Sequence, residues 1–349
     1  MRKWTLLKQR FTLGFMLLCI AILATWAARR LVQEPHMLFI VGDPIELQES
    51  VPVLAPNVVG AGDVTFASPP QAEIEMIRQL LPRPTLQPLS AQQVEGLSNF
   101  NYLTNRIFLV DPETILLPSD INVQQFLEAD LTIDTSTEGP LVLIFHTHSA
   151  EMFIDSNPTD PMTGVMGVGR YLAEILTDYH GLEVLHHTGR FDFIDGRSNR
   201  LGSYERMEPV IRQILADNPS IQVVIDLHRD GVLDHVPAFV HYVDGMPTAQ
   251  IMFFNGLSRQ NRNGQPVTVY RLPNPYQQQN LNFSFQMQLA ANQLYPGLAR
   301  RIYLRAFRYS LHMAPLSTLV EVGNQHNTLQ QAKNAMYPLA NIIAAVVLE

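Results

Sequence analysis

The chain has little cysteine, and the only thiol lies near its start. Cys19 stands inside the most apolar stretch of the sequence. The rest of the chain can therefore form no disulfide and offers no cysteine nucleophile or thiolate metal ligand. Any metal site further along must be built from His, Asp or Glu side chains.

An excess of basic residues is also missing. The 349 residues include 24 Lys and Arg against 32 Asp and Glu, a formal net charge of −8. Nucleic acid needs clustered positive charge, so it is excluded as a partner. The sequence also lacks G-x-S-x-G, H-E-x-x-H and a glycine-rich phosphate loop, which argues against a serine hydrolase of that type, an H-E-x-x-H metalloprotease and a nucleotide-phosphate site.

Residues 11–28 are an apolar run without a charged side chain. A run of about 18 such residues just spans a bilayer core. Basic residues on its N-terminal side favour a cytoplasmic N-terminus, and these are Arg2, Lys3, Lys8 and Arg10. A cleaved signal peptide is the alternative, but its apolar region is usually shorter, about 7–15 residues. We expect residues 1–30 to be a cytoplasmic tip and an uncleaved single-pass anchor in the cell membrane, with the rest of the chain extracytoplasmic.

Proline recurs through residues 31–138 and discourages regular elements. Short amphipathic islands over 72–81 and 121–127 predict helices, but sustained periodicity is absent. This segment is predicted to be a stalk.

From residue 139 onward, buried-strand and helix patterns alternate with short connections, as in an α/β domain. The predicted fold is a mostly parallel or mixed central sheet with helices on both faces. Strands are expected over 141–145, 182–185, 221–225, 238–242, 249–254, 302–304 and 316–322, and helices over 162–176, 203–215, 280–294 and 328–347. Thr328 and Gln331 form the capping box of the last helix.

Two histidines follow the first predicted strand of this domain. His146 and His148 are two residues apart, which on an extended backbone points both side chains to one side, and Glu151 can curl back toward them. Ligand sites of open α/β sheets favour the carboxyl ends of strands. His-x-His is a plausible half of a zinc site, and a surface histidine pair is the alternative.

A second cluster, D-L-H-R-D at 226–230, follows the strand predicted over 221–225. If the two strands are neighbours in a parallel sheet, both tips lie on one rim. Three protein ligands and a water are typical of catalytic zinc, so we predict His148, Glu151 and His228 as the ligands. Arg229 beside them is suited to holding a carboxylate or carbonyl of the substrate. A salt-bridged turn is the alternative.

Glu321 lies within an otherwise apolar strand, where a carboxylate is costly without a partner. Facing a metal-bound water, it would serve as general acid and base. The alternative is a solvent-facing residue of an edge strand.

The chain resembles the stage II sporulation protein P family, whose members are relatives of the zinc-dependent N-acetylmuramoyl-L-alanine amidases. Four motifs carry the resemblance, and these are F-H-T-H-S-A-E at 145–151, D-L-H-R-D at 226–230, Y-P-G-L at 295–298, and L-V-E-V-G at 319–323 with N-T at 327–328. They occur in the family's order over most of residues 140–349. The resemblance implies an amidase that removes stem peptides from peptidoglycan during engulfment of the forespore, beside a lytic transglycosylase and other engulfment proteins.

The amidase pattern falls on His148, Glu151, His228 and Glu321. His146 is a further candidate catalytic residue, and it is also the alternative to His148 as the ligand, because the two differ only by register. A peptidoglycan endopeptidase cutting peptide cross-links is one alternative function. An inactive, membrane-tethered module that binds the cell wall is another.

Overall fold

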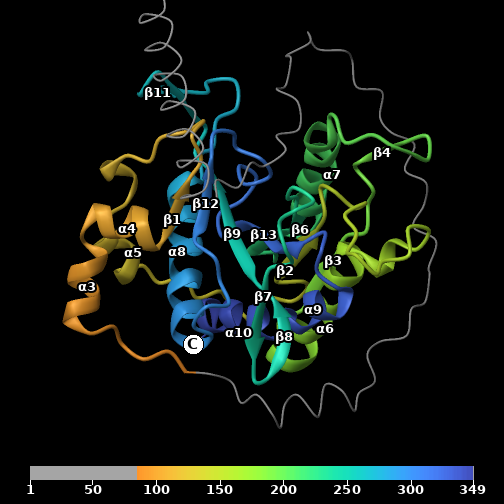
Figure 1. Ribbon diagram of the computed structural model, residues 1–349, viewed down its shortest axis with the longest axis horizontal. Coiled ribbons are helices and arrows are strands. Elements are labelled where there is room, and N and C mark those ends of the chain that lie inside the picture. Colours follow the sequence, from red (N-terminus) through yellow and green to blue (C-terminus); the bar gives the residue numbers. More distant parts are fainter. Residues whose placement is uncertain (1–84, 349) are drawn as a thin grey trace, which may run out of the picture. The chain divides into compact units, whose positions relative to one another are not determined.

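The structure is a computed structural model that describes residues 85–348. Its main feature is a seven-stranded mixed sheet of order β1-β12-β9-β13-β6-β2-β3 (Figure 1). The strands are β1 (Phe108–Val110), β2 (Val142–Phe145), β3 (Val184–His186), β6 (Val223–Asp230), β9 (Ile251–Gly256), β12 (Ile302–Arg305) and β13 (Ser317–Asn324). Neighbours pair in parallel throughout, except that β13 pairs with β9 antiparallel. The strands β3, β2, β6 and β13 therefore end at one edge of the sheet.

The apolar run of β2 is buried on both faces, as the sequence predicts for a central strand. Alternate side chains enter different cores. Leu143 and Phe145 pack with Met207 and Ile211 of α7 (Ser203–Asp217), whereas Ile144 belongs to the larger core on the other face. Helices thus cover both faces of the sheet, which confirms the predicted α/β architecture.

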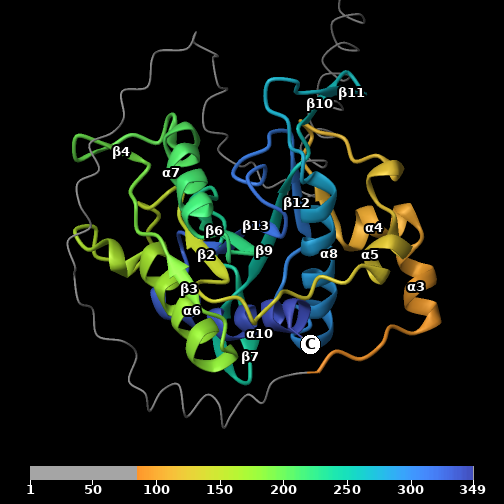
Figure 2. The same ribbon diagram turned by 180° about the vertical axis from the view of Figure 1, so that it is seen from behind.

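The larger core lies beneath three helices, α6 (Val165–His180), α8 (Gln277–Leu294) and α10 (Met336–Val347). Helix α10 packs against both α6 and α8, as the view from behind shows (Figure 2). Helix α6 ends at Gly181, whose φ of +74° is the left-handed conformation that favours glycine at a helix end. A capping box of Thr328 and Gln331 opens α9 (Leu329–Asn334) as predicted, but a break at Ala335 separates α9 from α10.

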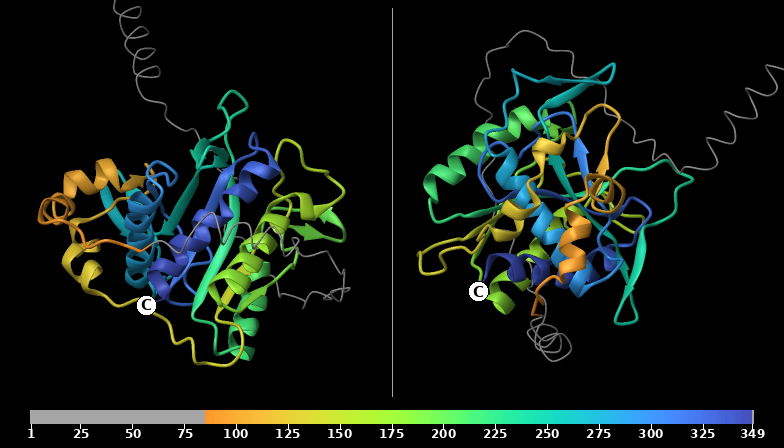
Figure 3. Two further views of the ribbon diagram at one scale, coloured as in Figure 1. Left: turned by 90° about the horizontal axis from the view of Figure 1, so that it is seen from below. Right: turned by 90° about the vertical axis from the view of Figure 1, so that its left-hand side faces the viewer.

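The described part of the predicted stalk forms α3 (Ala91–Leu97), α4 (Phe100–Arg106), η1 (Pro118–Asp120) and α5 (Val123–Glu128), with β1 pairing in parallel with β12. Helix α5 packs against α8, and the orange and yellow helices lie beside α8 in both views of Figure 3. The predicted domain boundary at residue 138 stays a prediction. Between residues 85 and 348, no helix is long and apolar enough to cross a membrane, and the anchor predicted over 11–28 lies outside the described residues.

Three antiparallel hairpins and a short helix complete the description. They are β4 (Phe193–Ile194) with β5 (Arg197–Ser198), β7 (Val240–Val243) with β8 (Met246–Ala249), β10 (Arg259–Arg262) with β11 (Gln265–Thr268), and η2 (Pro161–Thr163). One sequence expectation is wrong in detail. The strand predicted over 221–225 continues as β6 to Asp230, so the second cluster lies within the strand.

Candidate functional site

Neighbouring strands bring the predicted site residues together at one edge of the sheet. Strands β2 and β6 pair in parallel with Phe145 opposite Asp226, so the histidine segment after β2 lies beside β6. Thr147 donates to both oxygens of Asp226, from its N–H at 2.9 Å and from its hydroxyl at 2.7 Å. On the other side of β6, Glu321 of β13 pairs with His228. The predicted adjacency of the two strand tips is confirmed.

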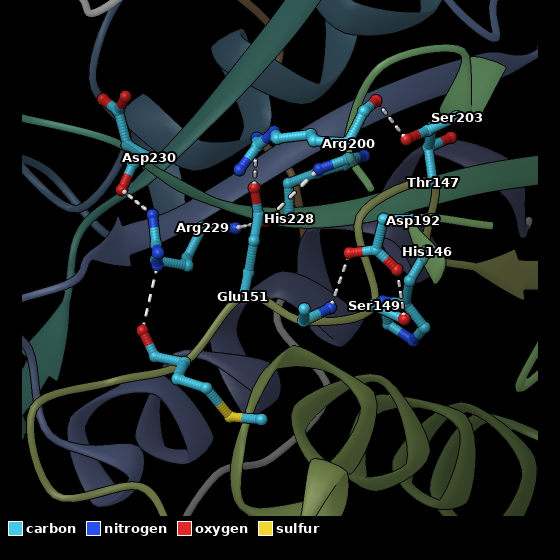
Figure 4. Close-up of polar contacts among 12 residues, drawn as sticks. His146, Thr147, Ser149, Glu151, Asp192, Arg200, Ser203, His228, Arg229 and Asp230 are labelled. Carbon is cyan, nitrogen blue, oxygen red and sulfur yellow. Dashed lines mark hydrogen bonds and ion pairs between the residues drawn. The ribbon is translucent and has the colours of Figure 1, made fainter. Parts of the chain in front are cut away.

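Glu151 is the centre of the polar contacts in Figure 4. Its Oε1 accepts from Arg200 at 2.7 Å, and its Oε2 accepts from the Arg229 backbone N–H at 3.0 Å and lies 3.3 Å from Nδ1 of His228. Burial alone would raise the pKa of Glu151, but the positive charges of His228, Arg200 and Arg229 outweigh it and hold the pKa well below its usual value. Glu151 is therefore a buried, ionised carboxylate.

His228 lies between two carboxylates. Its Nε2 is 2.7 Å from Oδ1 of Asp226, and its Nδ1 faces Glu151. Burial works to lower the pKa of His228, but the charges of Asp226 and Glu151 raise it well above the usual range. Since a carboxylate on one ring nitrogen orients the imidazole, Asp226 determines which nitrogen His228 turns toward Glu151.

His148 stands next to this pair with a free ring nitrogen. Its ring centroid lies 5.3 Å from that of His228, nearly perpendicular to it, and 5.5 Å from that of Tyr204. Its Nδ1 is buried without a hydrogen-bond partner, and burial lowers the pKa of His148 to about 3. A neutral imidazole with an available lone pair is the form that binds metals.

Glu321 is partly buried, and its Oε2 is shielded from solvent without a hydrogen-bond partner. Burial first, and the charge of Asp230 second, raise the pKa of Glu321 to about 8. Arg300 binds Asp230 at 2.8 Å and partly neutralises that charge. The site thus holds two glutamates with opposite pKa shifts.

His146 turns away from the other predicted residues. Its Nδ1 bonds the Leu227 carbonyl at 2.7 Å and its Nε2 lies 2.8 Å from Nε2 of His186. Helix α6 passes so close that a Cβ on Gly169 would come 2.5 Å from the His146 ring. The expectation that His146 and His148 point to one side is wrong, because β2 ends at Phe145 and residues 147–150 form a turn.

The guanidinium of Arg229 is held by the chain itself. Its Nε donates to the Met152 carbonyl at 2.9 Å and its Nη1 to the Asp230 carbonyl at 3.0 Å (Figure 4). Its backbone N–H holds Glu151, so Arg229 joins the first motif to the second.

The donor types suit zinc, because two imidazoles and a carboxylate are a usual catalytic set. The orphaned Nδ1 of His148 points to the same conclusion, since a buried polar atom without a partner needs an explanation. Across residues 85–348, however, no three His, Cys, Asp or Glu side chains are arranged to hold a metal ion. The reason is that Glu151 and His228 are turned toward each other and toward Arg200 and Asp226. The residues therefore fit zinc in kind and lie side by side at the sheet edge, but their side chains are paired with one another and with Arg200 and Asp226.

Three residues of the site lie outside the sequence motifs, and a fourth, Asp226, lies inside one but was given no role. Asp226 carries a usable signal, because it lies two residues before His228 on the same face of a strand. Arg200, Tyr204 and Asp192 carry none. Asp192 accepts from the Ser149 hydroxyl at 2.5 Å and the Ala150 N–H at 2.9 Å, and so holds the turn after β2.

Comparisons with known proteins agree with the sequence motifs. Stage II sporulation protein P of Bacillus subtilis (strain 168) is 22% identical over 228 residues, which are 60% of this chain and 52% of that protein. The chain therefore spans about half the length of this curated relative.

Solved structures give partial overlaps. N-acetylmuramoyl-L-alanine amidase AmiC2 of Nostoc punctiforme is 14% identical with a TM-score of 0.35, covering 59% of this chain and 97% of that one. An N-acetylmuramoyl-L-alanine amidase from Clostridium difficile 630 is 15% identical with a TM-score of 0.36, covering 60% and 94%. Identities and TM-scores this low support no statement about the activity of this chain. The family model described as stage II sporulation protein P matches residues 92–344, more than half of the chain, and the protein therefore belongs to that family.

Proposed function

We propose that this protein is a membrane-anchored, zinc-dependent peptidoglycan hydrolase, an N-acetylmuramoyl-L-alanine amidase that cleaves the amide between glycan strand and stem peptide. The observation that carries the proposal is the meeting of His148, Glu151 and His228 beside Glu321 at one sheet edge. Membership of the stage II sporulation protein P family supports a role in the cell wall during sporulation.

His148, Glu151 and His228 would hold the zinc ion. When bound, zinc polarises the amide carbonyl and lowers the pKa of its water to near 7. Other residues hold these ligands in position. Asp226 orients His228, and Arg200 and the Arg229 N–H bind Glu151. Supporting contacts of this kind typically change metal affinity about 10–100-fold when removed.

Glu321 takes a proton from the attacking water and delivers it to the leaving nitrogen. The water oxygen first forms a C–O bond to the carbonyl carbon, and the C–N bond then breaks as the nitrogen receives the proton, so the glutamate is unchanged at the end. In the metal-free site the pKa of Glu321 is about 8, and the positive charge of a bound zinc ion would lower it toward the neutral range in which the group both accepts and releases a proton. The unpartnered Oε2 leaves an oxygen available for water.

Arg229 is assigned to substrate binding. Two of its N–H donors bind backbone carbonyls, which leaves further donors for a carboxylate or carbonyl of the stem peptide. His146 is assigned to the support of the site, through its bond to the carbonyl of Leu227, the residue before His228.

The cellular setting comes from the sequence and the family resemblance. We assign the anchor to residues 11–28, with a cytoplasmic N-terminus and an extracytoplasmic catalytic region, and expect the protein to act during engulfment beside a lytic transglycosylase.

The proposal predicts that the purified protein releases stem peptides from sacculi and that a strong chelator abolishes the release. Added zinc should restore it. Mass spectrometry of the products distinguishes the amidase from an endopeptidase. An amidase leaves a new free amine on the L-alanine of the stem peptide, whereas an endopeptidase leaves the new amine on a residue of the peptide cross-link. Full release of stem peptides in the presence of chelator would rule out the metal.

Matched histidine variants provide the control for the ligand assignment. His148→Ala should reduce bound zinc, measured by atomic emission on the protein as purified, to less than a tenth of the wild-type amount. His146→Ala removes an imidazole two residues away that faces His186, so it should retain more zinc than His148→Ala. The reverse ranking would make His146 the ligand.

A further inference from the structure

We propose that Tyr204 is a catalytic residue of this site, whose hydroxyl donates a hydrogen bond to the carbonyl oxygen of the scissile amide as that oxygen gains negative charge. The inference rests on the amidase function proposed above. Tyr204 would add a neutral phenol donor to the site, a residue type that is absent from the predicted metal ligands and from Glu321.

Tyr204 is placed at the site by the start of a helix. It is the second residue of α7, and its ring stands edge-on to the ring of His148, at 5.5 Å between centroids and 87° between planes. On its other side the ring contacts Tyr309 at 5.5 Å, and Tyr309 in turn contacts Phe254 of β9 at 4.7 Å. A row of aromatic rings therefore runs from His148 across this face of the sheet.

The hydroxyl of Tyr204 has no hydrogen-bond partner in the part of the chain that the structure describes. Among residues 85–348 neither Tyr204 nor Tyr309 makes a side-chain hydrogen bond, whereas the Tyr303 hydroxyl donates to Asp111 and that of Tyr171 bonds Tyr337. Tyrosine hydroxyls that lie inside a protein usually find a partner. Tyr204 is only partly exposed, so its free hydroxyl is available to a ligand in the site.

Tyr204 lies near the carboxylates of the site. Burial is the main cause of the raised pKa of Tyr204, and the carboxylates of Asp226, Glu321 and Glu151 each add to it. Arg200 is paired with Glu151, whereas Arg229 keeps donors that are assigned to another part of the stem peptide.

Amide hydrolysis needs a donor of this kind. Attack of water at the carbonyl carbon converts the C=O bond into a C–O⁻ group, and preorganised N–H or O–H donors lower the barrier by meeting that charge. Tyr204 only donates a hydrogen bond. The proton balance of the reaction stays with Glu321, and the phenol keeps its proton throughout.

The wall behind Tyr204 is held rigidly. Tyr309 has a φ of +51°, a left-handed conformation that is rare for an aromatic residue and is often found at functional sites. Glu208 of α7 binds Arg308 of the loop that carries Tyr309 at 2.8 Å, and His312 Nδ1 bonds the Tyr309 carbonyl at 3.0 Å. One helix thus positions both tyrosines.

The test is the Tyr204→Phe variant of the full chain, assayed on a soluble muropeptide. The ring and its contacts remain, so zinc content and thermal unfolding midpoint should match the wild type. We expect kcat to fall about 100–1,000-fold, as for the loss of one oxyanion donor, with KM within about twofold. An unchanged kcat would overturn the proposal, and so would a loss confined to KM, which would make Tyr204 a ground-state binding residue.

Tyr303→Phe is the matched control. It makes the same chemical change further along the row of rings, where the hydroxyl lost is bonded to Asp111. It should lower the unfolding midpoint and leave kcat unchanged, which separates structural loss from catalytic loss. If the wild-type protein releases no stem peptide, the proposed function itself fails and this inference with it. An active wild type with an equally active Tyr204→Phe variant overturns the inference alone.

Discussion

Two glutamates of the site, Glu151 and Glu321, differ in charge state because their neighbours differ. Glu151 faces His228, Arg200 and the Arg229 N–H, and these hold it ionised against the cost of burial. Glu321 has no hydrogen-bond partner on Oε2 and shares the site with the charge of Asp230, so its pKa rises to about 8. Because the pKa values of the two carboxylates are shifted in opposite directions, Glu151 can act as a permanent negative charge and Glu321 as a proton carrier.

Glu321→Gln should lose activity and gain stability in metal-free protein. Loss of a general base costs typically about 100–10,000-fold in rate. The pKa of Glu321 rises on folding from 4.5 to about 8, so the folded chain holds this proton more tightly. Stability from this group is therefore present at low pH and lost as the pH rises through that window. The unfolding free energy of Glu321→Gln minus that of wild type should grow between pH 5 and pH 8.

The measurement is urea unfolding in excess chelator at pH 5, 6.5 and 8, with Glu95→Gln as control. Glu95 lies on α3. Its variant should track the wild type at every pH. A gap between wild type and Glu321→Gln that shrinks as the pH rises would contradict the assigned environment of Glu321.

At the scale of single residues, the sequence predicted which residues cluster at the site but not which of the two histidines, His146 or His148, faces the other members. His148, Glu151, His228 and Glu321 meet as predicted, because they follow or occupy neighbouring strands. The choice between two histidines depends on where β2 ends, and strand ends are poorly specified by local pattern. The turn that starts at Thr147 sends the two rings in different directions.

At the scale of elements, the loop that carries β4 and β5 fastens the histidine turn in place. Asp192 holds Ser149 and Ala150 at one end of this loop, and Arg200 holds Glu151 at the other. Arg206 of α7 donates to the carbonyls of Phe191 and Asn199 and so closes the loop upon itself. The loop therefore sets the position of a predicted metal ligand without containing one.

Asp192→Asn should loosen this turn. The amide keeps one acceptor oxygen, so one of the two bonds to the Ser149–Ala150 pair is lost and a buried donor is left unpaired, at a cost of about 1–3 kcal/mol. Zinc affinity, measured by competition with a chelating dye, should fall about 10–100-fold. Asp217→Asn, an exposed change at the far end of α7, should alter neither zinc affinity nor the unfolding midpoint. Equal zinc affinity in the two variants would remove Asp192 from the support of the site.

At the scale of the whole molecule, residues before 139 contribute to the same sheet as the site. Phe108 of β1 is fully buried, and β1 covers the edge of β12. Arg259 and Asp120 form two hydrogen bonds between this segment and β10. The free energy of this packing belongs to the folded body even though the segment's proline-rich sequence predicts a stalk.

A fragment of residues 139–349 should therefore be less stable than one of residues 85–349. Removing a single buried phenylalanine side chain costs about 3–5 kcal/mol, and the shorter fragment also exposes β12 as an unpaired edge. We expect a lower unfolding midpoint and aggregation during gel filtration. If the two fragments had equal unfolding midpoints and each eluted as a monomer in gel filtration, a domain boundary at residue 138 would be supported.

The sequence by itself determined the α/β class, the buried strands β2, β6 and β13, and the group of ligand-type residues beside them. These follow from local patterns, a period of two in strands and 3.6 in helices, and from motifs read along the chain. Only the tertiary structure decided the antiparallel join of β9 to β13, the place of β1 at the sheet edge, and the positions of Arg200, Tyr204 and Asp192. The physical reason is that these depend on contacts between residues far apart in the chain, as when Arg200 reaches Glu151 across 49 positions, and no local pattern records them.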